Sequence, residues 1–130
     1  MRSVVVDTNV IVSAALTAMG KPAEIIRLIS AGKICLYYSE GILAEYIEVL
    51  SRPKLKISPE IQTDIIMALQ ENGILVSTPT SSVPLADETD RIFYDTAKAS
   101  GAILITGNSK HYPAEMFIMT PSEFLISVNQ

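Results

Sequence analysis

Three acidic side chains, Asp7, Glu45 and Asp90, together with the amide of Asn108, are the residues whose types and positions could do chemistry in this sequence. Carboxylates that converge at one place repel one another and stay ionised only when a cation lies between them. Oxygen ligands without a thiolate or imidazole favour Mg²⁺ or Mn²⁺ over zinc. Such an ion lowers the pKa of a bound water and binds a phosphodiester oxygen. We therefore expect metal-assisted hydrolysis if the fold brings these side chains together.

Short apolar runs alternate with helical patterns along the chain. This alternation implies right-handed crossovers and a mainly parallel sheet. The expected fold is α/β, a three-layer α/β/α sandwich around a five-stranded, mainly parallel sheet. The expected strands are 3–6, 34–38, 74–76, 102–105 and 116–119. The expected helices are 9–16, 22–31, 40–51, 59–72, 89–100 and 121–125.

The ends of two expected strands give the polar residues a common place. In open parallel sheets, ligands bind beyond the carboxyl ends of the strands, where the strand order reverses. Asp7 follows the first expected strand, and Thr106-Gly107-Asn108 follows the fourth. If these strands are neighbours, the two segments face each other across that crevice.

Two acids on helices can join this site. Helical spacing places Glu45 on the flank of the apolar stripe of helix 40–51, and Asp90 at the edge of the stripe in the first turn of helix 89–100. Asp95 projects from the opposite side of the second helix, so Asp90 is the better candidate. The same helical spacing predicts that three apolar residues point toward the core: Ile47, Ile61 and Ala99.

The composition indicates one domain over residues 1–130, since 48% of the residues are hydrophobic and the chain is too short for two cores. A net charge of −4 argues against a protein that holds nucleic acid by a broad basic surface. Cys35 is the only cysteine, so no intrachain disulfide forms, and a cytoplasmic location is expected. Asp7 and Asn9 interrupt the apolar start, which argues against a signal peptide, and no apolar run is long enough to span a membrane.

Four segments carry a resemblance to a known family. They are Val4-Val5-Val6-Asp7-Thr8-Asn9-Val10, Ser39-Glu40-Gly41-Ile42-Leu43-Ala44-Glu45, Asp87-Glu88-Thr89-Asp90-Arg91-Ile92-Phe93, and Ile103-Leu104-Ile105-Thr106-Gly107-Asn108-Ser109-Lys110-His111-Tyr112-Pro113. In these segments the chain resembles the PIN-domain nucleases, specifically the VapC-like toxins of toxin–antitoxin modules. The resemblance covers nearly the whole chain.

The resemblance implies a site, an activity and partners. Asp7, Glu45 and Asp90 would be the acidic metal-site residues, and Asn108 would occupy the fourth position. The residues that would support the site are Thr8, Asn9 and Thr106. The implied activity is Mg²⁺- or Mn²⁺-dependent endoribonuclease cleavage of RNA by a toxin that a cognate antitoxin restrains. The family also implies the sheet order 3-2-1-4-5 and a homodimer.

The sequence departs from the commonest family pattern in one segment. Many relatives carry a fourth acid near positions 106–108, whereas Asn108 is neutral, and His111 stands where an aspartate is frequent. An amide can orient a water or a ligand but supplies no charge. A second metal ion is therefore not implied here.

Each acid also has a structural interpretation. Asp7, Thr8 and Asn9 are all good helix caps, so Asp7 could simply begin the next helix. Asp90 could close a capping box begun at Asp87, or interact with the helix dipole. Glu45 could be a solvated residue on a helix flank. The combination favours function, because independent caps need not fall at the positions that one crevice requires.

Two of three rival classes of protein need motifs that this chain lacks. A dinucleotide- or nucleotide-binding module needs GxGxxG or GxxxxGK[ST], and neither occurs. A haloacid-dehalogenase-type phosphatase needs a second acid two residues after the first, where this chain has Asn9. The third alternative is a degenerate PIN domain that binds RNA or an antitoxin without catalysis.

Overall fold

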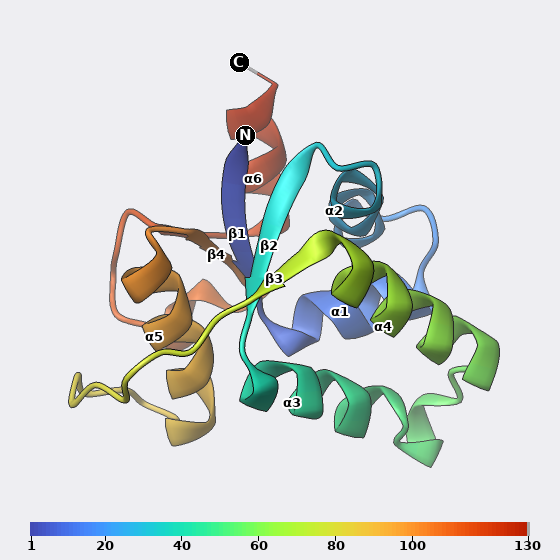
Figure 1. Cartoon of the computed structure of the whole chain (residues 1–130), viewed down its shortest axis with the longest axis horizontal. Coiled ribbons are helices and arrows are strands. Elements are labelled where there is room, and N and C mark those ends of the chain that lie inside the picture. The colour runs from blue at the N-terminus through green and yellow to red at the C-terminus, as the bar shows by residue number, and fades with distance from the viewer. Residues whose placement is uncertain (130) are drawn as a thin grey trace.

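Five strands form one sheet in the computed structural model, which describes residues 1–129 (Figure 1). Each neighbouring pair is parallel, and the order is β3-β2-β1-β4-β5. The α/β fold and the strand order implied by the resemblance are confirmed, and the sheet is wholly rather than mainly parallel. The strands are β1 (Arg2–Val6), β2 (Ile34–Tyr38), β3 (Gly73–Leu75), β4 (Ile103–Ile105) and β5 (Ile118–Met119).

β1 is the central strand, and it pairs with both β2 and β4. Residues 4–6 are fully buried. Both faces of this strand are covered, which explains why the run is continuously apolar rather than alternating. Because Val6 pairs with Ile105, the residues that follow β1 and β4 emerge side by side at the carboxyl edge of the sheet.

Local sequence signals set the ends of the helices. Ser39 accepts a hydrogen bond from the backbone N–H of Ile42 and begins α3. Gly101 ends α5 in the left-handed region, with a φ of +65°. The helices are α1 (Thr8–Leu16), α2 (Lys21–Ser30), α3 (Glu40–Leu50), α4 (Pro59–Asn72), α5 (Arg91–Ser100) and α6 (Pro121–Val128). Short 3₁₀ turns lie at Pro53–Leu55, Glu88–Asp90 and Ser109–His111.

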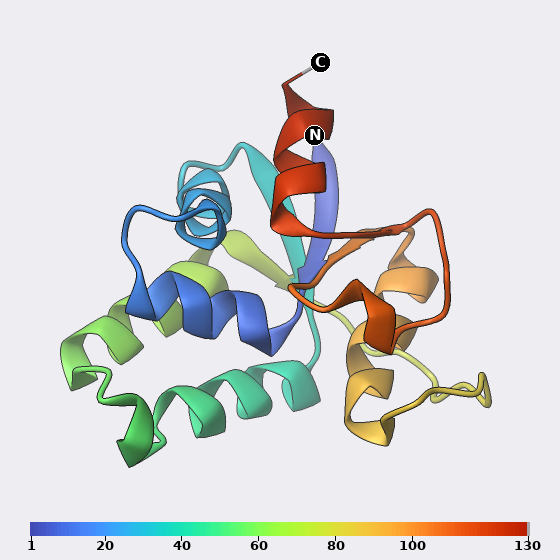
Figure 2. The same ribbon diagram turned by 180° about the vertical axis from the view of Figure 1, so that it is seen from behind.

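The helices cover both faces of the sheet. α5 contacts β1, β2 and β4 on one face, while α1, α2 and α4 gather on the other (Figures 1 and 2). α6 packs against α2 and β5, at the end of the molecule where both termini lie. The strands run from that end toward α3, so the first turns of α3 and α5 lie at the carboxyl edge of the sheet (Figure 1).

Some predicted boundaries differ from the structure. The helix expected from residue 89 begins at Arg91, because Glu88–Asp90 form a 3₁₀ turn. The last helix continues to Val128 rather than residue 125, and β5 is shorter than expected. Across residues 1–129, no helix combines the length and apolar character needed to cross a membrane. The predicted domain also includes Gln130, which lies outside the described residues.

Four predictions about side-chain direction were wrong. Ile47 and Ile61 are 48% and 42% exposed, because their neighbours on α3 and α4 fill the core and leave these two at the rims of surface grooves. Ala99 is exposed because α5 is buried on all sides from residue 93 to residue 97 and its last turn lies beyond this buried stretch. Asp95, expected to project away from the apolar side of the helix, is buried, since Ser81 from the preceding loop covers it.

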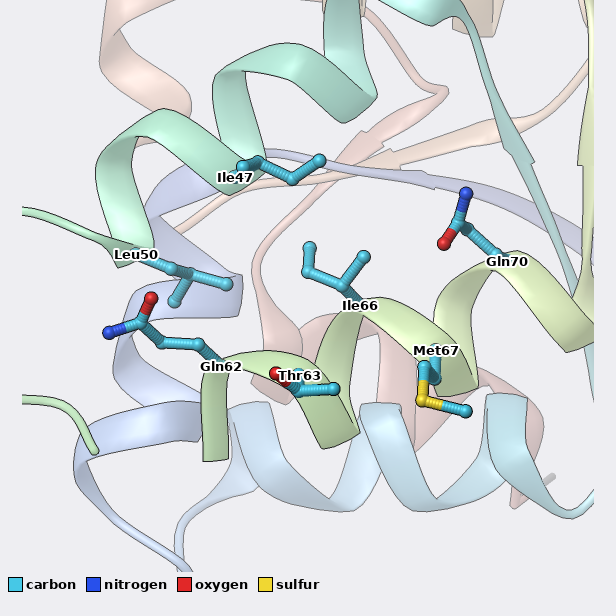
Figure 3. A pocket seen from close by; sticks show the side chains of 7 residues that line it. All are labelled: Ile47, Leu50, Gln62, Thr63, Ile66, Met67 and Gln70. Atoms are coloured by element: carbon cyan, nitrogen blue, oxygen red, sulfur yellow. The ribbon is translucent and has the colours of Figure 1, made fainter. Parts of the chain in front are cut away.

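An apolar groove of about 350 Å³ lies between α3 and α4. In it, Ile47 of α3 and Ile66 of α4 face one another (Figure 3). The lining residues are Ile47, Leu50, Gln62, Thr63, Ile66, Met67 and Gln70. None of these side chains is ionisable, so this groove is not a candidate for metal chemistry.

Gly73 marks a tight contact between α4 and β3 and provides a test of this packing. A Cβ atom there would lie 2.5 Å from the carbonyl oxygen of Leu69 and 2.8 Å from Cε1 of Tyr38. We expect Gly73→Ala to lower the free energy of unfolding by about 1–3 kcal/mol, because the backbone must shift. Urea unfolding followed by circular dichroism measures this change.

The matched control is Gly41→Ala in the first turn of α3. A Cβ atom at Gly41 meets only Ser39 Oγ, at 3.9 Å. This variant should be as stable as the parent or slightly more stable, because alanine favours helix over glycine. Equal losses in the two variants would contradict the packing described at Gly73.

Candidate functional site

Asp7 lies at the end of β1 with its carboxylate buried. Thr106 and Tyr112 each donate a hydrogen bond to Asp7 Oδ2, over 2.8 Å and 2.9 Å. Asp7 is the N-cap residue of α1, but its side chain makes no capping bond to the helix, so capping alone does not account for the carboxylate. Burial raises the pKa of Asp7 above its usual value, and the two hydroxyl donors partly offset this increase.

Glu45 is fixed beside the first turn of α1. Thr8 donates a hydrogen bond from Oγ1 to Glu45 Oε2, and the Glu45 side chain is half-buried. The adjacent Tyr46 is fully buried and donates from its hydroxyl to the carbonyl oxygen of Val6. These contacts hold the middle of α3 against the end of β1 and the start of α1. Glu45 is therefore not a freely solvated residue on a helix flank.

Asp90 precedes α5 and has an unusual environment. Its Oδ2 is buried without a hydrogen-bond partner, a situation found at no other side-chain nitrogen or oxygen atom within residues 1–129. Burial, followed by the charges of Asp7 and Asp87, raises the pKa of Asp90 to about 6. Asp90 makes no capping bond, so it does not close a capping box. Asp87 performs the capping instead, accepting from the backbone N–H and hydroxyl of Thr89.

The segment after β4 lies against the segment after β1, as predicted. Asn9 accepts a hydrogen bond from the backbone N–H of Gly107 over 3.0 Å. A Cβ atom at Gly107 would lie 3.3 Å from Asn9 Oδ1, so a side chain there would crowd this contact. Thr106 is completely buried and accepts from the backbone N–H of Asn108. Thr106 and Asn9 thus join the two segments directly.

Asn108 is exposed, and its amide contacts His111. No hydrogen bond joins its side chain to the three acids in the part of the chain that the structure describes. Asn108 lies in the predicted segment, but its neighbour is an imidazole. Its role at a fourth metal-site position stays a prediction.

The three acids share one electrostatic environment without forming a ready ligand shell. The charges of Asp7 and Glu45 both raise the pKa of Asp90. However, among residues 1–129 no group of three or more His, Cys, Asp or Glu side chains is close enough to hold one metal ion directly. Mg²⁺ in proteins usually keeps several waters and binds one or two carboxylates, and Asp90, with its unpartnered Oδ2, and Asp7 fit that requirement.

A family comparison identifies the fold that carries this site. Residues 3–110 match the family described as PIN domain. The chain belongs to the PIN domain family. This match confirms the resemblance found in the sequence, and it spans β1 through β4 together with Asp7, Glu45, Asp90 and Asn108.

Two individual proteins are similar to this PIN domain. It is 35% identical over 108 residues to the uncharacterized protein MJ1680 of Methanocaldococcus jannaschii, covering 81% of this chain and 70% of that protein. It also matches a chain in the crystal structure of VapBC2 from Rickettsia felis bound to a DNA fragment from their promoter. That match has a TM-score of 0.60 and 15% identity, and it covers 91% of this chain and 98% of the other. At this identity, the second similarity shows the fold alone.

The sequence interpretation noted His111 but missed Tyr112 as a contributor to this PIN-domain site. Tyr112 is buried and bonded to Asp7, although 105 residues separate them in the chain. His111 lies close enough to affect the pKa values of Asp7 and Asp90. Both residues lie in the quoted segment that follows β4. A bulky aromatic residue in that polar segment was the available signal for Tyr112.

The environment of Asp90 predicts a pH-dependent stability. Because its pKa is raised in the folded protein, ionised Asp90 destabilises the fold above about pH 6, and this penalty fades as the pH falls toward 4. In metal-free protein, Asp90→Asn should therefore raise the free energy of unfolding at pH 7.5 by about 1 kcal/mol, a value reduced for partial solvation. The gain should vanish near pH 4. Urea unfolding in EDTA at several pH values measures it.

Asp87→Asn is the control, for which we expect a change in stability of the opposite sign. The two bonds from Thr89 lower the pKa of Asp87, so its ionised form stabilises the fold at neutral pH. This variant should lose stability at pH 7.5 where Asp90→Asn gains it. A loss of stability in both variants would show that Asp90 is not under electrostatic strain.

Proposed function

We propose that this protein is a Mg²⁺- or Mn²⁺-dependent endoribonuclease and the toxin of a toxin–antitoxin pair. The proposal rests on the environment of Asp90. Its Oδ2 atom is buried without a hydrogen-bond partner, and burial together with the charges of Asp7 and Asp87 raises its pKa. Perturbed carboxylates at the carboxyl edge of a parallel sheet are typical of a functional site. Membership of the PIN domain family supports the nuclease class.

Several residues would have different roles at the proposed site. Asp7 and Asp90 would hold the metal ion, with Glu45 at the side where Thr8 fixes it. When bound, the ion supplies activation of a water and stabilisation of charge on the phosphate. Thr106 and Tyr112 orient Asp7 through its Oδ2. The carboxylate of Glu45 can accept a proton from a water at the site.

A second candidate function is a degenerate PIN domain that binds RNA or an antitoxin without cleavage. Two observations favour it. Asn108 is neutral and contacts His111 rather than an acid. No three-carboxylate ligand group is assembled among residues 1–129. Metal binding and cleavage must therefore be measured together.

The metal site makes a sharp prediction for two acids. The parent protein should bind Mn²⁺ and cleave single-stranded RNA, and Asp7→Asn and Asp90→Asn should each abolish both. Tyr112→Phe should cost less, about 10–100-fold in Mn²⁺ affinity, because it removes only a hydrogen bond that orients Asp7. Calorimetry with Mn²⁺ and gel assays of RNA cleavage measure these effects.

Asp64→Asn on the exposed surface of α4 is the matched control, since it removes one carboxylate away from the site. It should keep the affinity and the rate of the parent. RNA binding that survives both site substitutions, in a protein that never cleaves RNA, would favour the binding module over the nuclease.

The proposal includes a cognate antitoxin and a homodimer. The structural neighbour from Rickettsia felis is a VapBC2 assembly. Light scattering on the purified protein should give twice the 14.1 kDa of one chain. Co-expression with the cognate antitoxin should abolish RNA cleavage, and the two proteins should purify as one complex. A monomer, or RNA cleavage that the antitoxin does not affect, would contradict this part of the proposal.

A further inference from the structure

The segment from residue 106 to residue 112 forms a loop whose two ends are tied to one oxygen atom. Thr106 at its start and Tyr112 at its end both donate to Asp7 Oδ2. Both end residues are buried, whereas Gly107, Asn108 and His111 between them are exposed. The loop therefore presents its middle residues to solvent beside the carboxylate of Asp7.

The imidazole of His111 is held in place within this loop. The side-chain Nδ2 of Asn108 lies 3.0 Å from Nε2 and 3.3 Å from Nδ1 of His111. The backbone N–H of His111 also donates to the carbonyl oxygen of Asn108 over 3.1 Å. In the neutral ring one nitrogen can accept from the amide and the other carries a hydrogen. The exposed side chain of His111 is thus held in place by Asn108 and has one ring N–H that can donate.

His111 lies near the acids without pairing with them. Its charge lowers the pKa values of Asp7, Asp87 and Asp90, so it lies within electrostatic reach of all three. The ion pairs found in residues 1–129 all involve arginine, and none involves His111. A role as the counter-ion of one carboxylate therefore does not account for its position.

We propose that His111, positioned by Asn108, donates a hydrogen bond to a phosphate oxygen of RNA at the acidic site. The inference rests on the proposed function and adds a residue that binds the substrate. A chain with a net charge of −4 must offer donors where a polyanion meets its carboxylates. The neutral amide of Asn108 suits this role, because an acid at that position would repel the phosphate.

The composition of the chain offers a direct test. His111 is the only histidine, so the ring C–H signals in a proton NMR spectrum of the untagged protein belong to this residue alone. The probe is a short single-stranded RNA oligonucleotide, added to the full chain with Mg²⁺. The ring signals should shift with RNA concentration along the same curve as fluorescence anisotropy of the labelled RNA. RNA that binds without shifting them, or RNA that does not bind at all, overturns the inference.

Substitutions separate phosphate binding from a structural role. His111→Ala should weaken RNA binding about 10-fold, as expected for loss of one hydrogen bond to a charged group, and leave the midpoint of urea unfolding unchanged. His111→Gln, which keeps a donor, should recover part of the loss, and Asn108→Ala should show a smaller loss than His111→Ala. A fall in the stability of His111→Ala that matches its loss of RNA affinity would instead indicate a structural role and overturn the inference.

Lys110→Ala distinguishes a specific contact by His111 from a general effect of positive charge, because it removes a full positive charge from the neighbouring exposed residue. Equal losses of RNA affinity in Lys110→Ala and His111→Ala would overturn the assignment of a specific contact.

Failure of the proposed function gives a different result. If the parent protein binds RNA without cleaving it, the nuclease proposal fails, while the NMR and affinity measurements still decide the role of His111. If the parent cleaves RNA and His111→Ala matches it in affinity and rate, the role of His111 fails and the nuclease proposal stands.

Discussion

The buried carboxylate of Asp7 at the end of the central strand is the constraint on which the rest of the site depends. A carboxylate removed from water is costly unless hydrogen-bond donors surround it. Thr106 and Tyr112 supply these donors to one oxygen atom. Both come from the segment that follows β4, which is close only because β4 pairs with β1 in parallel. The order of the sheet and the chemistry of its edge are therefore linked through one side chain.

Two acids of the α5 region differ in how their carboxylates are satisfied. Asp95 is buried and accepts two hydrogen bonds from Ser81, so it fastens the preceding loop to the helix. Asp90, which immediately precedes α5, keeps one buried oxygen without a partner and lies beside other acids. Strain of this kind is expected where a fold holds groups for a ligand rather than for its own stability.

One group of opposite charge character lies among the acids. The chain is acidic overall, yet its single histidine lies within reach of three carboxylates. Both ends of the loop that carries His111 donate hydrogen bonds to Asp7, so the acidic site and the imidazole belong to one hydrogen-bonded unit. The proposed phosphate contact and the proposed metal-holding acid Asp7 are thus joined by the hydrogen bonds of one short loop.

The sequence by itself determined the elements and the general place of the site. Periodicity, caps and breakers predicted the strands and helices to within a few residues. The strand order implied by the family resemblance then predicted that the segments after the first and fourth strands would meet. The tertiary structure alone decided that Tyr112 bonds to Asp7, that Asp95 is covered, and that Asn108 contacts His111. The physical reason is that backbone patterns are local, whereas these contacts depend on how loops pack, and the contact with Asp7 joins residues 105 positions apart.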